Sequence, residues 1–330
     1  MARIVRFHEF GGPDVLKLEE LSEKSPAKAE VRIKVSAIGL NRAEVVFREG
    51  RYLERPEKLP SQIGYEASGT IDAVGDGVTT FKIGDKVSTI PAFSMSQYGV
   101  YGESAIVPVT AVSHFPDSLS FEEGASIWMQ YLTAYGALIG YSKIKPGDFV
   151  VVTAASSSVG YAAIELINAA GATAIATTRT KAKKQNLLDA GASDVVVTDD
   201  EDLVERVAAI TGGRGANVIF DPIAGPIVKK LAEIAAPGAV IYEYGALSGA
   251  ETPFPLFQAL RKGLSVRGYS LFELTGDPAK LELARSYVFN ALKDRKLKPL
   301  IDKTFKLDEI ADAHRYMESN QQNGKIVVTV

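Results

Sequence analysis

The sequence predicts an α/β protein that joins a β-rich part to a doubly wound parallel sheet, because the texture of the chain changes near its middle. From residue 1 to about 125, short β-rich runs such as 30–37 and 69–74 alternate with Gly, Pro and Asp turns. From about 147 to 270, apolar runs alternate with amphipathic segments of helical period. Strands rich in Val and Ile that alternate with helices are typical of a parallel sheet with helices on both faces.

The second part repeats the order strand, helix, strand. Strands are predicted at the apolar runs 149–154, 174–178, 194–198, 217–221, 239–245 and 264–270, and helices at 161–171, 181–191, 202–212 and 227–236. The tail then predicts a long helix over about 278–295, another over 310–319 and a closing strand, KIVVTV. Because that strand is β-rich like the front of the chain, we expect the tail to pack back onto the first part.

Composition limits the class of protein. The chain has 330 residues, 46% of them hydrophobic and 23% charged, and no apolar run approaches the roughly 18–20 residues of a membrane span. Its start, MARIVRFHEF, lacks the apolar region of a signal peptide, so we expect a cytosolic protein. A net charge of −3 argues against a nucleic-acid or acidic-membrane partner.

The sequence offers no pattern for a metal site. There is no cysteine, which excludes disulfides and thiolate ligands. The three histidines, His8, His114 and His314, show no metal-ligand spacing, so we predict no metal. A G-x-S-x-G nucleophile elbow is also missing, and a serine hydrolase is therefore not indicated.

The stretch VVTAASSSVG at 151–160 has the form of a strand and turn that introduce a dinucleotide phosphate. Ala154, Ser157 and Gly160 occupy the small positions of an A-x-x-S-x-x-G spacing. Small residues let phosphate oxygens approach the N–H groups at a helix N-terminus, and a serine hydroxyl can cap the helix or bond the phosphate. The alternative is that the serines only cap a helix in some other α/β protein.

The end of the next predicted strand bears on which cofactor binds. Arg179 follows Gly160 by nineteen positions, with three lysines just beyond it and no competing carboxylate. An Asp or Glu near this place bonds the ribose 2′-hydroxyl of NAD, whereas an arginine accommodates the 2′-phosphate of NADP. A guanidinium with ammonium neighbours suits a dianionic phosphate. The pattern favours NADPH, and the alternative is a solvated basic helix start.

Further motifs follow one another in a recognisable order: NRAE at 41–44, GYEASG at 64–69, FKIGDKV at 81–87, YGESA at 101–105 and LTAYGAL at 132–138. Over essentially the whole chain this order resembles the zinc-independent quinone oxidoreductase branch of the medium-chain dehydrogenase/reductase superfamily. The resemblance implies a GroES-like catalytic domain over 1–125, a Rossmann NADP-binding domain over 126–268 and a return segment over 269–330 that completes the catalytic domain.

Departures from the zinc enzymes of this superfamily are informative. Those enzymes have a cysteine near the place of Asn41 and a Gly-His-Glu where this chain has Gly64-Tyr65-Glu66. A metal that would polarise a substrate carbonyl is therefore not expected. Hydride transfer without a metal is feasible when the acceptor already carries an electrophilic carbon. The resemblance thus implies an NADPH-dependent reductase of quinones or α,β-unsaturated carbonyl compounds.

The resemblance also implies roles for individual residues. Candidates for the catalytic pocket are Asn41, Tyr52, Tyr65 and Thr133. Candidates for cofactor contact are Asn41, Thr133, Ser156, Ser157, Ser158, Val159, Thr178, Arg179, Lys183, Gly245, Ala246, Ser270, Leu271, Phe272, Asn323 and Lys325. Tyr52, Tyr65 and Tyr131 can donate a proton if they face the pocket, but aromatics more often serve packing, and no residue stands out as the general acid.

Two positions carry weaker expectations. Many relatives have a tyrosine after the third strand of the cofactor domain that contacts the adenosine phosphate, and Thr198 occupies that place here. We expect this contact to be either weakened or replaced by Lys181 or Lys184. Asp221, at the end of a strand, is expected to be structural and to hold the following turn.

Other functions stay open at this point. A medium-chain enoyl-thioester reductase would need a cleft near Tyr65 and Phe272 long enough for an acyl chain. A non-catalytic NADPH-binding sensor or structural protein would carry the same cofactor residues. As partners we expect a small-molecule substrate, and the resemblance implies a homodimer formed through edge strands of the cofactor domain.

Overall fold

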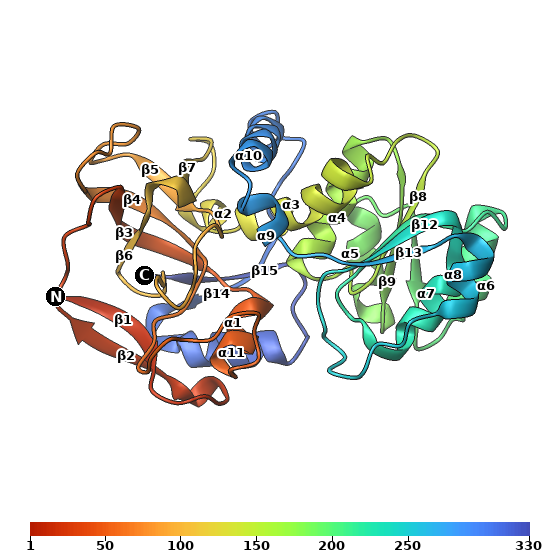
Figure 1. The fold of residues 1–330 in the computed structure, drawn as a ribbon, viewed down its shortest axis with the longest axis horizontal. Coiled ribbons are helices and arrows are strands. Elements are labelled where there is room, and N and C mark those ends of the chain that lie inside the picture. Colours follow the sequence, from red (N-terminus) through yellow and green to blue (C-terminus); the bar gives the residue numbers. More distant parts are fainter. The chain divides into compact units, whose positions relative to one another are not determined.

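The computed structural model describes all 330 residues, and the chain divides into two compact units. Unit 1 contains Met1–Met129 and Pro299–Val330, and unit 2 contains Gln130–Lys298. Figure 1 shows the last strand of the chain among the early strands of unit 1. The predicted fold class, a β-rich domain completed by the tail plus a parallel-sheet domain, is confirmed.

The return to unit 1 begins at Pro299, whereas the sequence analysis began it at 269. Residues 269–298 stay with unit 2 because their aromatic side chains pack there. The Tyr269 hydroxyl donates to the Leu132 carbonyl at 3.5 Å, and the rings of Tyr287 and Tyr135 lie 5.1 Å apart. These contacts join residues far apart in the chain, and local sequence carries no signal for them. They therefore set a boundary that the sequence did not show.

Unit 1 is built on a seven-stranded sheet in the order β14-β15-β3-β4-β5-β7, with β6 also paired to β3. The strands are β3 (Glu30–Gly39), β4 (Glu66–Val74), β5 (Lys86–Thr89), β6 (Ser104–Pro108), β7 (Val112–His114), β14 (Ile301–Lys306) and β15 (Lys325–Thr329). Two further strands, β1 (Ala2–Phe7) and β2 (Leu16–Leu21), form an antiparallel pair. Alternate side chains of a strand share a face, so Val31, Ile33 and Val35 of β3 all reach the core.

The helices of unit 1 are short. They are α1 (Arg42–Arg48), α2 (Phe121–Gly124) and α11 (Ile310–Glu318), with the 3₁₀ turns η1 (Pro13–Val15), η2 (Val109–Ala111) and η6 (Leu307–Glu309). The helix α3 (Trp128–Tyr135) contains the first passage between the units. On α1 the buried residues include Glu44 and Arg48, which lie four positions apart on one helix face. Buried charged groups need partners, so α1 points to a polar site inside unit 1.

Unit 2 contains a sheet of six parallel strands in the order β10-β9-β8-β11-β12-β13. The strands are β8 (Phe149–Val152), β9 (Thr173–Thr178), β10 (Asp194–Val197), β11 (Ala216–Asp221), β12 (Ala235–Glu243) and β13 (Ser265–Gly268). The chain moves outward from β8 to β10 and then resumes on the other side of β8 at β11. In such sheets ligands bind at the carboxyl ends of the strands, near this reversal.

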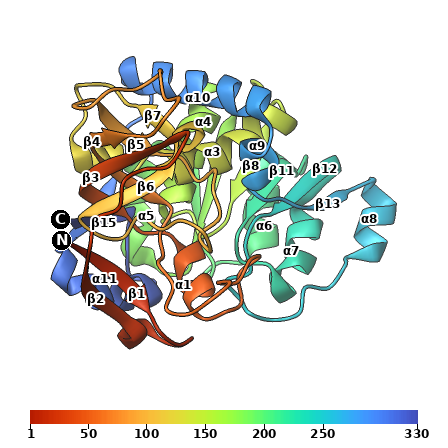
Figure 2. The same ribbon diagram turned by 60° about the vertical axis from the view of Figure 1, so that its left-hand side comes forward.

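Helices cover both faces of the parallel sheet. The helices of unit 2 after α3 are α4 (Ser158–Ala169), α5 (Lys184–Asp189), α6 (Leu203–Thr211), α7 (Val228–Ile234), α8 (Leu256–Lys262), α9 (Phe272–Thr275) and α10 (Pro278–Lys293), with the shorter η3 (Gly136–Tyr141), η4 (Lys181–Lys183) and η5 (Gly225–Ile227). Val151 and Ile219 pack toward α6 and α7, which lie next to each other in Figure 2. Val150 and Val152 face the opposite way, where α4 contacts the sheet.

The helices α3, α8 and α9 were not predicted. No residue of α8 is buried, so α8 lacks the apolar stripe facing a core on which the sequence analysis relied. The sequence signal for the end of α8 was Gly263, which has a left-handed conformation with φ of 63°.

Across the whole chain, no helix has both the length and the apolar character needed to cross a membrane.

The contact of β3 with β4 leaves no room for a side chain at Gly69. A Cβ atom there would lie 2.0 Å from the Lys34 carbonyl oxygen, which cannot move without breaking the strand pairing. We expect Gly69→Ala to lower the free energy of unfolding by roughly 1–3 kcal/mol, the usual cost of overpacking. Gly12→Ala is the control, because a Cβ at Gly12 meets nothing within 4 Å. Equal thermal stability of the two variants would contradict this reading.

Candidate functional site

The turn between β8 and α4 is tight. Ala154 has a φ of 45°, a left-handed conformation that favours glycine. Ser157 is the N-cap of α4, and its Oγ accepts a hydrogen bond from the Gly160 N–H at 3.1 Å. A Cβ at Gly160 would lie 2.3 Å from the Ala155 carbonyl oxygen, so only glycine fits there. The three small positions of the motif are thus all needed to bring β8 and α4 together.

The serines of this turn keep donors for a ligand. Ser157 Oγ accepts from Gly160, and Ser156 Oγ accepts from Lys183 Nζ at 3.3 Å. A hydroxyl has one proton and two lone pairs, so both serines can still donate to a phosphate oxygen. Ser158 and Val159 stand in the first turn of α4, whose N–H groups have no acceptor within the helix. These features fit a diphosphate group.

The basic run after β9 divides into two pairs of residues with different surroundings. Lys181 lies 3.3 Å from Asp200, and Lys184 lies 4.0 Å from Glu201, so carboxylates already neutralise both. Arg179 is exposed directly after β9, and Lys183 reaches the serine turn. The two lysines expected to replace the tyrosine contact thus have carboxylate partners, whereas Lys183 contacts the turn between β8 and α4.

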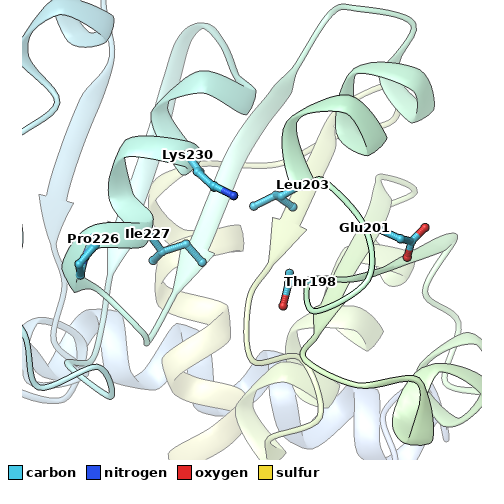
Figure 3. A pocket seen from close by; sticks show the side chains of 6 residues that line it. All are labelled: Thr198, Glu201, Leu203, Pro226, Ile227 and Lys230. Carbon is cyan, nitrogen blue, oxygen red and sulfur yellow. The ribbon is translucent and has the colours of Figure 1, made fainter.

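A pocket of about 300 Å³ opens on the face of the sheet that α6 and α7 cover (Figure 3). It is lined by Thr198, Glu201, Leu203, Pro226, Ile227 and Lys230. Lys230 of α7 extends toward Leu203 at the start of α6 in this view. Apolar side chains thus sit beside one ammonium group, next to Thr198, the residue that follows β10.

Asp221 and Glu243 end the neighbouring strands β11 and β12 in direct register. Asp221 accepts from the Ala224 N–H at 2.7 Å and from the Thr153 hydroxyl, which matches the structural role expected of it. Both carboxyl oxygens of Glu243 are buried without a hydrogen-bond partner. Burial, together with the charge of Asp221, raises the pKa of Glu243 well above its usual range. The sequence analysis did not single out Glu243.

The other predicted cofactor residues of unit 2 lie at the same carboxyl edge because its strands are parallel. Gly245 and Ala246 follow β12, and a Cβ at Gly245 would lie 2.7 Å from the Pro222 carbonyl oxygen. Ser270, Leu271 and Phe272 follow β13, where Ser270 Oγ accepts from the Phe272 N–H at 3.2 Å.

Two further candidates of unit 2 are nearly buried. Thr178 is the last residue of β9, beside the basic run. Thr133 is buried on α3.

In unit 1, Asn41 belongs to a buried polar cluster with Glu44, Glu66 and Lys325. Lys325 Nζ donates to Asn41 Oδ1 at 2.6 Å and also to Glu66. Asn41 Nδ2 donates to Glu66 Oε2 at 3.1 Å and to Glu44 Oε1 at 3.3 Å. Lys325, expected to reach the cofactor, therefore has its ammonium inside unit 1. Asn323, half-buried, lies two residues before it.

The pKa of Glu44 is shifted by its position in this cluster. Burial raises its pKa to about 7, and Lys325 and Asn41 only partly oppose this effect. Its Oε1 also accepts from the Tyr65 N–H at 3.2 Å, while its Oε2 has no partner. Glu44 lies in the motif NRAE and Glu66 in GYEASG, but no role was predicted from the sequence for either glutamate. Burial of charge, which a single sequence does not show, was the missing signal.

The candidate tyrosines are committed to carboxylates. Tyr65 donates to Glu54 Oε1 at 3.0 Å, and Glu54 is held in turn by the Met95 N–H at 2.8 Å. Tyr52 hydrogen-bonds to Tyr65, and burial raises the pKa of both hydroxyls. Tyr131 donates to Glu165 at 2.6 Å. Tyr65 and Tyr131 thus give their single hydroxyl proton to a carboxylate, which leaves the Tyr52 proton for the Tyr65 oxygen.

No three side chains of His, Asp or Glu gather closely enough to hold a metal ion. Comparison with protein families finds two matching models. Residues 27–117 match the alcohol dehydrogenase GroES-like domain, and residues 158–286 match a zinc-binding dehydrogenase. These ranges correspond to unit 1 and to the parallel-sheet part of unit 2.

Known proteins resemble the chain over its full length. Quinone oxidoreductase 1 of Escherichia coli is 32% identical, with 98% of each chain covered. A 2-haloacrylate reductase from Burkholderia is 30% identical over 99% of this chain and 98% of the relative. The crystal structure of an E. coli quinone oxidoreductase complexed with NADPH superposes with a TM-score of 0.91 at 30% identity, covering 99% of this chain and all of the other. The protein is thus an oxidoreductase that belongs to the quinone oxidoreductase branch of the medium-chain dehydrogenase/reductase superfamily.

Proposed function

We propose that the protein is an NADPH-dependent, zinc-independent reductase of quinones or α,β-unsaturated carbonyl compounds. The observation that carries the proposal is the contact of Lys183 with Ser156. This contact joins the turn between β8 and α4 to the basic run after β9, where Arg179 is exposed. A dianionic 2′-phosphate complements these cations better than a ribose hydroxyl does. The NADPH in the superposed E. coli structure supports the same choice of cofactor.

Each part of unit 2 has a role in holding the cofactor. The serine turn and the start of α4 would hold the diphosphate, and Arg179 with Lys183 would hold the 2′-phosphate. The pocket of Figure 3 offers Leu203 and Ile227 as a surface for the adenine base. The bound cofactor supplies the hydride. The residues after β12 and β13 would orient the nicotinamide end of the cofactor.

The substrate class follows from the chemistry of the acceptor. The names of the relatives, a quinone oxidoreductase and a 2-haloacrylate reductase, describe acceptors that carry an electrophilic carbon. Such a carbon can take up hydride from the cofactor without a metal to polarise the acceptor.

Turnover tests the proposed activity directly. We expect the purified protein to oxidise NADPH in the presence of quinones or enones and to leave saturated ketones unchanged, because a saturated ketone lacks the electrophilic alkene carbon. Absorbance of NADPH measures the rate. Binding of NADPH without turnover of any acceptor would indicate a sensor, and a clear preference for an enoyl thioester would indicate the acyl-chain reductase instead.

Arg179→Ala tests the assignment of the 2′-phosphate. We expect NADPH binding to weaken roughly ten- to hundredfold with little change for NADH, since a hydrogen bond to a charged group contributes about 1.5–3 kcal/mol. Lys181→Ala is the matched control, because that lysine is already paired with Asp200. Fluorescence titration of each variant gives the affinities. Equal losses for the two cofactors would remove the assignment.

The outer edge of unit 2 supports a homodimer. β13 is the last strand of the sheet, so its outer hydrogen-bonding groups remain available to a second strand. Beside it, Phe257 and Leu260 of α8 are 82% and 72% exposed, and Phe254 is 62% exposed. Two copies related by a twofold axis can pair these edges and cover the apolar side chains, since the same patch then faces itself.

We expect Leu260→Arg to shift the protein from dimer to monomer in light scattering after gel filtration, because a charge is then buried at the paired edge. Leu283→Arg is the control. That leucine is similarly exposed, at 68%, but lies on α10 rather than beside β13. A monomeric wild-type protein, or a Leu260→Arg variant that stays dimeric, would contradict this interface.

A further inference from the structure

Charged groups surround the Asn41 side-chain amide and decide which way it points. An ammonium carries only donors, so Lys325 Nζ, at 2.6 Å, has to face the amide oxygen. The Glu66 carboxylate carries only acceptors, and Glu44 Oε1 already accepts from the Tyr65 N–H, so both have to face the amide nitrogen. Reversing the amide would place like groups together at every contact. The orientation of Asn41 is therefore determined by chemistry as well as by geometry.

This orientation leaves Asn41 with one kind of free capacity. Its Nδ2 carries two protons and already faces three acceptors, Glu66 at 3.1 Å and both Glu44 and the Gly39 carbonyl at 3.3 Å. Its Oδ1 has two lone pairs, and Lys325 uses one of them. Asn41 can thus accept one more hydrogen bond, but it has no proton left to donate. A carbonyl oxygen cannot bind to it, whereas a hydroxyl group can.

Lys325 contacts Asn41 as well as the carboxylate that balances its charge. Its side chain is fully buried, and β15 carries it to the end of β3, where Asn41 follows two residues after the strand. A buried lysine is retained only when its charge is matched, and Glu66 supplies the match. Replacing such an ion pair by apolar residues is often neutral for stability. We therefore expect Lys325 to have a role other than stabilising the fold.

We propose that Lys325 is a positioning residue that fixes the Asn41 amide, so that Asn41 accepts a hydrogen bond from a ligand hydroxyl and cannot polarise a carbonyl oxygen. This inference rests on the proposed function, in which the hydroxyl belongs to a ribose of the cofactor. Lys325 then acts on binding through Asn41 and does not touch the cofactor itself.

A double-mutant cycle tests the coupling. Asn41→Ala and Lys325→Met are each expected to weaken NADPH binding about tenfold, and the double variant should bind no more weakly than Asn41→Ala alone. Lys86→Met is the matched control, because the Lys86 ammonium donates to the Leu119 carbonyl and lies over the Phe115 ring. Losses that multiply to about a hundredfold, or a Lys325→Met variant that binds like the wild type, would overturn the proposal.

Lys325→Met leaves Glu66 without its cation, which can prevent folding. The cycle is therefore repeated with Lys325→Met/Glu66→Gln in place of the single variant, since the added neutral amide keeps the charge balanced. Thermal unfolding verifies the fold of every variant. The same pattern of non-additive losses is expected, and additive losses in this background would count against the proposal.

A second measurement does not depend on cofactor binding. In nuclear magnetic resonance spectra the Asn41 side-chain amide is identified by its loss in Asn41→Ala, and slow hydrogen exchange is expected in the wild type. Lys325→Met/Glu66→Gln should exchange at least about tenfold faster, because only the 3.3 Å contacts to Glu44 and the Gly39 carbonyl then remain. Unchanged exchange would overturn the positioning role. If the wild type fails to bind NADPH, the proposed function falls, while this experiment still decides the role of Lys325.

Discussion

Parallel pairing of all six strands in unit 2 is the constraint on which the rest of its chemistry depends. Because every strand ends at the same edge, the serine turn after β8, Arg179 after β9 and Gly245 after β12 share that edge although they are far apart in sequence. Parallel strands need a crossover between them, and the helices that provide it bury the apolar faces of the sheet. The same arrangement puts the N-terminus of α4 at this edge, where we propose that the diphosphate binds.

In unit 1 the corresponding constraint is the neutralisation of buried charge. Glu44 and Glu66 enter the interior from α1 and β4, and Lys325 comes from the last strand of the chain. The return of the chain through β15 does more than complete a sheet, since it carries the only lysine that contacts both Asn41 and Glu66. Buried charge without this partner would cost several kcal/mol by the usual magnitude, so the tail and the polar cluster depend on each other.

Much of the fold was predictable because its signals are local. Continuous apolar runs identified the strands of unit 2, segments of period 3.6 identified most of its helices, and a β-rich closing strand indicated the return of the tail. The helix α8 escaped because nothing buries it, and the boundary at Pro299 escaped because only the packing of Tyr269 and Tyr287 assigns their segment to unit 2. Both unpredicted features depend on tertiary contacts, which produce no periodic pattern in a sequence.

The sequence by itself determined the phosphate turn and the basic residue that follows it, since both lie within one strand-helix-strand unit whose geometry depends on neighbours along the chain. Only the tertiary structure decided the partners of the basic run, because Lys181 and Lys184 meet Asp200 and Glu201 after β10 pairs with β9. It also decided the direction of the Asn41 amide, which depends on a lysine 284 positions away. Spacing along a chain encodes local geometry, whereas the partner of a buried charge is known only after the strands have paired.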